Sequence, residues 1–178
     1  MMMQMLKAGG LAILTDNLRE RDENNSEGYL EFERVKKLKD GDYGWLNEAK
    51  GKAVKIISSL LEYLPGSNEY KIIFMNREME EILASQEQML QRLGKPHQGS
   101  NNDRLGSIYQ KHLNQISSWL RNQNNMEIIY INFNQTIDNP ELTSKNVADF
   151  LGTTLDISNM VRAVYRDLYH HRNAKFSQ

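Results

Sequence analysis

Arg77 and Ser85 are the two side chains whose types and spacing point most directly to chemistry. Arg77 follows an apolar run at residues 70–75, and Ser85 lies eight positions later in a segment with a helical pattern. An arginine can donate two parallel hydrogen bonds to one phosphate, and a serine hydroxyl can donate another. Parallel sheets bind their ligands where strands end and helices begin. The pair therefore indicates one half of a phosphate-binding site.

The same junction also has a purely structural interpretation. Asn76 is a good N-cap for a helix over 77–92, and acidic residues fill the first turns of that helix, where its dipole favours them. Eight helical residues span about 12 Å, so Arg77 and Ser85 share a ligand only if Arg77 reaches back from the end of the strand. Both interpretations stay open.

Two further residues are candidates for the same site. Glu31 could serve as the general base for an acceptor hydroxyl, and Arg172 could help to hold a phosphate. The alternative for Glu31 is a solvated helix glutamate beside Glu27 and Glu33. The alternative for Arg172 is a charge that stabilises the C-terminal end of a helix.

The adjacent histidines His170 and His171 do not predict a metal site. Neighbouring residues on a helix point about 100° apart, and Asp167 is the one acidic residue at a spacing that could complete a ligand set. We therefore expect no metal cofactor.

The elements that must position these residues alternate along the chain. Short apolar runs predict strands, and the segments between them have helical patterns or cap residues. This alternation favours a parallel sheet with helices on both faces. The expected strands are 11–14, 52–57, 70–75 and 127–133, and the expected helices include 1–8, 29–39, 77–92, 104–122, 141–152 and 156–172.

Composition limits the class of protein. The chain has 178 residues, a net charge of -1 and no cysteine, which suits one domain without disulfides. The charge balance lacks the clustered basic surface of a nucleic-acid-binding protein. No apolar run reaches the roughly 18 residues of a membrane span. We expect a single cytoplasmic domain over 1–178, without nucleic acid or membrane as a partner.

Several segments resemble the P-loop sulfotransferases. The stretch "KIIFMNREMEEILAS" resembles the 3′-phosphate-binding segment of that family, in which a hydrophobic strand is followed by Arg and, eight positions on, by Ser. The opening "MMMQMLKAGG" resembles the helix after the family's phosphosulfate loop. "NNSEGYLE" is similar to a bacterial sulfotransferase-like pattern, and "IIYINFNQTIDNPELTSKNVADFLG" resembles the family's late strand, Asn-Pro turn and final helix. The likeness runs over about residues 1–172.

The resemblance implies an α/β fold with a three-layer, P-loop NTPase-like parallel sheet flanked by helices. It implies a transferase that moves a sulfuryl group from 3′-phosphoadenosine 5′-phosphosulfate to a hydroxyl or amine acceptor. Arg77 and Ser85 would hold the 3′-phosphate of that nucleotide or of its product, adenosine 3′,5′-bisphosphate.

One departure from the family pattern is large. The family's first strand and its 5′-phosphosulfate loop would precede Met1, and no G-x-x-x-x-G-K-[ST] segment occurs in the chain. We therefore expect a domain without its first strand and P-loop, inactive by itself; a translation start placed too far downstream would explain this. The alternative is a non-catalytic remnant that serves as a nucleotide- or protein-binding module.

Overall fold

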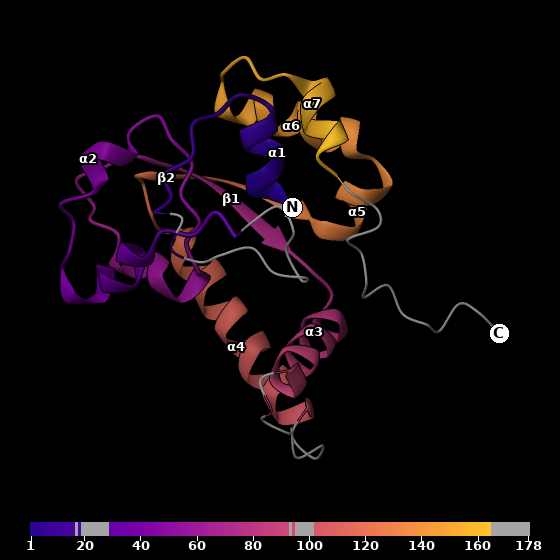
Figure 1. Cartoon of the computed structure of the whole chain (residues 1–178). Coiled ribbons are helices and arrows are strands. Elements are labelled where there is room, and N and C mark those ends of the chain that lie inside the picture. Colours follow the sequence, from indigo (N-terminus) through magenta and orange to yellow (C-terminus); the bar gives the residue numbers. More distant parts are fainter. Residues whose placement is uncertain (17, 19–28, 93, 95–101, 165–178) are drawn as a thin grey trace.

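The computed structural model describes residues 1–16, 18, 29–92, 94 and 102–164 (Figure 1). In chain order its elements are α1 (Met2–Ala8), the 3-10 helix η1 (Glu33–Asp40), α2 (Leu46–Ala49), the 3-10 helix η2 (Ser58–Tyr63), β1 (Tyr70–Asn76), α3 (Met79–Arg92), α4 (Asn102–Leu120), β2 (Met126–Asn132), α5 (Phe133–Asp138), α6 (Pro140–Leu151) and α7 (Ile157–Arg162).

β1 and β2 form a two-stranded parallel sheet. Their register runs from Tyr70 opposite Met126 to Asn76 opposite Asn132. Both strands are rich in isoleucine, a β-branched residue that packs well on a pleated surface. The predictions of these two strands and of a mixed α/β class are confirmed.

The other two predicted strands are reduced to a single contact in the described part of the chain. Ile13 and Ala53 form one isolated parallel bridge. Its hydrogen bonds run from the Ala53 amide to Ala12 and from the Leu14 amide to Ala53, at 2.8 and 3.0 Å. The parallel direction was predicted correctly, but strands over 11–14 and 52–57 were wrong, because one bridge does not make a ladder.

Helix boundaries differ from the predicted ones where turns take over. In the segment predicted as a helix over 29–39, residues 29–32 are not helical and the 3-10 helix η1 begins at Glu33. It is followed by Gly41, whose φ of 79° is left-handed and favours glycine. Asn76, which was predicted to cap a helix over 77–92, is the last residue of β1, and α3 begins at Met79. The prediction of a helix over 156–172 is confirmed for α7 and is wrong for residues 163–164, which follow its end at Arg162; residues 165–172 lie outside the described part.

Caps explain the ends of the helices after β2. The side chain of Asn132 accepts a hydrogen bond from the Gln135 amide at 2.9 Å and starts α5 directly at the end of β2. Asn139 starts α6 in the same way. The helix ends at Gly152, which has a φ of 66°.

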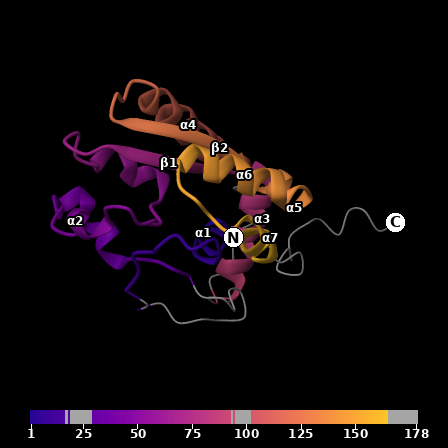
Figure 2. The same cartoon turned by 90° about the horizontal axis from the view of Figure 1, so that it is seen from above.

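Two apolar clusters pack on opposite faces of the sheet, because neighbouring strand residues alternate between them. Phe74 belongs to a cluster with η1, η2 and α4, whereas Ile73 and Met75 pack against a cluster formed by α1, α6 and α7. Figure 2 shows α4 and α6 on opposite sides of β2. Within the described ranges, no helix combines the length and apolar character needed to cross a membrane.

Candidate functional site

Arg77 lies between β1 and α3 and contacts residues that follow β2. Its Nε donates to Glu81 Oε2 at 2.9 Å, and its guanidinium carbon lies 4.8 Å from the centre of the Phe133 ring. Phe133 is the first residue after β2. Because the two strands are parallel and in register, their carboxyl ends meet at Arg77.

Glu81 is the most buried member of this group. The residue is 8% exposed. Its Oε1 atom accepts a hydrogen bond from Asn134 Nδ2 at 3.1 Å, so each carboxylate oxygen has a donor. Arg77, Glu81, Phe133 and Asn134 are called the Arg77 cluster below. A buried carboxylate without a donor or counter-charge would be costly, and the cluster supplies both.

Ser85 lies one helical turn beyond Glu81 on α3 and is half-buried. Glu81 and Ser85 are four apart on α3 and are therefore neighbours, whereas Arg77 precedes the helix. Arg77 forms its ion pair with Glu81, and Ser85 is not a member of that pair. Glu81 therefore lies at the centre of the predicted phosphate site, although the sequence pattern gave it no role there.

Glu31 precedes η1 and is paired with Lys55. Their Oε1 and Nζ atoms are 2.7 Å apart, and the Glu31 side chain is 22% exposed. The Glu31 carbonyl accepts hydrogen bonds from Thr15 Oγ1 and the Asp16 amide, and Asp16 Oδ2 accepts one from the Glu33 amide. The segment before η1 is thereby fixed against the end of 11–16. Glu31 is not a solvated residue of a helix face.

The backbone beside Glu31 is strained. Leu30 is buried and has a φ of 47°, a left-handed conformation that costs a residue with a Cβ about 1–2 kcal/mol. Such strain persists only where surrounding contacts enforce it, and it occurs often at functional positions. The enforcing contacts here are the hydrogen bonds that hold the Glu31 carbonyl.

Lys55 is a candidate residue that the sequence reasoning missed. The one signal for it was a lysine inside the apolar run 52–57. Burial lowers the pKa of the Met1 amino group, and the charge of Lys55 lowers it further.

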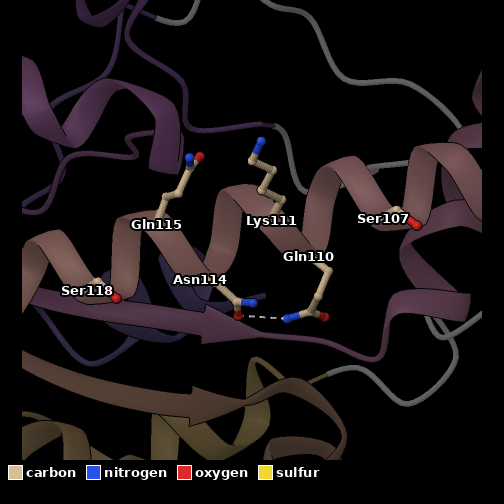
Figure 3. A pocket seen from close by; sticks show the side chains of 6 residues that line it. All are labelled: Ser107, Gln110, Lys111, Asn114, Gln115 and Ser118. Atoms are coloured by element: carbon tan, nitrogen blue, oxygen red, sulfur yellow. Dashed lines mark hydrogen bonds between the residues drawn. The ribbon is translucent and has the colours of Figure 1, made fainter.

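A shallow hollow lined by polar residues follows one face of α4. It includes no residue of the Arg77 cluster or of the Glu31–Lys55 pair. Figure 3 shows its lining, in which Gln110 Nε2 donates to Asn114 Oδ1 at 3.1 Å. All of its lining residues come from one helix: Ser107, Gln110, Lys111, Asn114, Gln115 and Ser118. It contains none of the predicted site residues.

His112 is part of a contact between helices. Its Nε2 is 2.8 Å from Ser58 Oγ, which joins α4 to η2. A serine–histidine pair is the start of a nucleophilic site, but such a site also needs a third group that orients the histidine. What the pair provides in the structure is a hydrogen-bonded contact between the two helices.

The remaining predicted residues are not placed. Arg172 and the histidines His170 and His171 lie outside the described residues. Over the ranges that are described, no three His, Cys, Asp or Glu side chains are grouped so that they could hold a metal ion.

Comparison of the chain with protein-family models, with curated proteins and with solved structures found no match.

Proposed function

We propose that this chain is a sulfotransferase-like protein that binds the 3′-phosphate end of 3′-phosphoadenosine 5′-phosphosulfate, or of adenosine 3′,5′-bisphosphate, at the carboxyl end of β1. The observation that carries the proposal is the position of Arg77. It is a half-buried arginine where two parallel strands end, held by a carboxylate and an aromatic ring. Ligands of parallel sheets bind at such ends, and arginine suits phosphate.

The finer fold proposed here is a three-layer, P-loop NTPase-like domain in which β1 and β2 are two strands of a larger parallel sheet. Two features support it. The apolar clusters cover both faces of the sheet, and the Ile13–Ala53 bridge is parallel like the β1–β2 pair.

In the complete reaction, the acceptor oxygen or nitrogen forms a bond to sulfur while the bond from sulfur to the phosphate oxygen breaks. The acceptor loses its proton to a base, for which Glu31 is the candidate, and adenosine 3′,5′-bisphosphate leaves. The Lys55 ammonium beside Glu31 supplies a positive charge close to that base. Transfer of this kind depends mainly on positioning and charge stabilisation, by analogy with phosphoryl transfer.

The sequence contains no phosphosulfate loop, so we expect nucleotide binding without sulfuryl transfer from the chain as given. That loop would hold the transferring group with backbone amides and a cation. Arg77 and Ser85 address the opposite end of the nucleotide and do not replace it.

The second candidate function is a non-catalytic binding module. The Arg77–Glu81 ion pair favours it, because the pair provides Arg77 with an anion from within the protein.

Isothermal titration calorimetry with adenosine 3′,5′-bisphosphate separates the two candidates. We expect the protein to bind the nucleotide and Arg77→Ala to lose most of that affinity. Arg34→Ala is the matched control, because Arg34 is also paired with a carboxylate, that of Asp42, but lies in the first turn of η1. No binding at millimolar nucleotide, or equal affinity in Arg77→Ala, would reject the proposal.

A further inference from the structure

We infer that Glu81 and Asn134 are positioning residues that fix the Arg77 guanidinium for a phosphate monoester. The inference rests on the proposed function and adds two residues to its site. Neither was singled out by the sequence pattern, because Asn134 lies 53 residues from Glu81 along the chain.

Two contacts with described residues help to hold the Arg77 side chain. Nε is hydrogen-bonded to Glu81, and the guanidinium carbon lies over Phe133. A free arginine side chain carries about 2 kcal/mol of rotamer entropy, and a ligand that orders it must offset that amount. An arginine that is already ordered binds with a smaller entropic penalty.

Glu81 is itself held by a residue from another element. Asn134 Nδ2 donates to the carboxylate oxygen that Arg77 Nε does not use. Asn134 lies on α5, whose start is fixed by the Asn132 cap at the end of β2. The relay from Asn134 to Glu81 to Arg77 therefore couples the carboxyl ends of both strands. Side chains that bind ligands or metals are often oriented by such supporting hydrogen bonds.

The charge of Glu81 makes the inference testable by sign. A carboxylate beside Arg77 repels an anionic ligand, so a residue that only competed for Arg77 would weaken binding, and its removal would strengthen it. A residue that orients Arg77 has the opposite effect, because its removal leaves the guanidinium disordered. If a residue only stabilises the fold, its replacement leaves the affinity for the ligand unchanged as long as the variant is folded.

The experiment measures the Kd of adenosine 3′,5′-bisphosphate by calorimetry for the wild-type protein, Glu81→Ala, Asn134→Ala and Glu80→Ala. We expect Glu81→Ala and Asn134→Ala each to weaken binding on the order of tenfold. Asn134→Ala changes no charge, so it reports orientation alone. Glu80→Ala is the control, since Glu80 is an exposed glutamate in the same helical turn, and its Kd should stay within about twofold of the wild-type value.

Thermal unfolding of each variant confirms that the titrations use folded protein. If the wild-type protein does not bind the nucleotide, the proposed function and this inference both fail. If it binds, and both Glu81→Ala and Asn134→Ala bind as tightly or more tightly, the inference is overturned while the proposed function stands.

Discussion

The Arg77–Glu81 ion pair should stabilise the fold far more than an exposed pair of the same spacing. Their side chains are 21% and 10% exposed, and the Nε to Oε2 distance is 2.9 Å. A hydrogen bond to a charged group contributes about 1.5–3 kcal/mol, and removal of one partner of a fully buried pair costs about 3–5 kcal/mol. For this partly exposed pair we expect about 3 kcal/mol of destabilisation from each single alanine variant. The coupling energy should be about 2 kcal/mol.

The assay is a double-mutant cycle of Arg77→Ala and Glu81→Ala, measured by urea unfolding at pH 7. The chain offers a matched control in Glu141 and Lys145. These residues are also four apart in sequence, and their Oε1 and Nζ atoms are 2.7 Å apart, but their side chains are 64% and 57% exposed. Exposed helix pairs of this kind contribute about 0.3–0.5 kcal/mol.

Both pairs join opposite charges four positions apart, and they differ most in burial; they also differ in the basic residue, arginine or lysine, and in its order along the chain. A coupling energy for Arg77 and Glu81 that is no larger than that of Glu141 and Lys145 would refute the reasoning. In that case the Arg77 cluster would not hold its members in place, and the proposed orientation of the guanidinium would have no energetic basis.

Three further predictions concern other parts of the fold. Gly9→Ala should destabilise the protein by about 1–3 kcal/mol in urea unfolding, because a Cβ there would lie 2.7 Å from Met160 Cγ in a fully buried contact; an unchanged unfolding midpoint would contradict it. Trp45→Phe should cost about 2 kcal/mol, since it leaves a cavity in the core and removes the bond from Nε1 to the Asp42 carbonyl at 2.9 Å; differential scanning calorimetry would detect the loss as a lower Tm. The Arg34 hydrogen bond holds the pKa of the Asp42 carboxyl below its ordinary 3.8, so the pair stabilises the fold above that pH, and the stabilisation is lost as the pH falls through the lower, folded-state pKa. The unfolding midpoints of wild type and Asp42→Asn should therefore differ at pH 7 and converge below about pH 4. A difference that persists at pH 2 would show another cause.

The parts of the fold that depend on local sequence were predictable. The strands at 70–76 and 126–132 have β-branched runs. The predicted bounds differ from the observed ones by one residue at the end of the first strand and by one residue at both ends of the second. Asp156 caps α7 through the Asn159 amide, and Gly152 ends α6, both as expected from the roles of those residue types. Each of these features involves residues only a few positions apart.

The parts that depend on distant partners were not predictable from the chain alone. Whether an apolar run becomes a strand depends on what lies beside it, and 11–14 and 52–57 meet at one bridge only. Lys55 is 24 residues from Glu31, so the pattern around either residue does not reveal their pairing. The role of Glu81 was hidden by a good local explanation, because an acid in the first turns of a helix is favoured by the dipole alone.

Hydrogen–deuterium exchange with and without adenosine 3′,5′-bisphosphate tests the central claim most directly, because it locates the ligand on the chain. Protection should appear in peptides that cover the β1–α3 junction around Arg77 and Ser85, and also at the start of α5 around Phe133 and Asn134. The Arg77→Ala variant should lose that protection. Unchanged exchange at saturating nucleotide, or protection confined to the polar face of α4, would contradict the account.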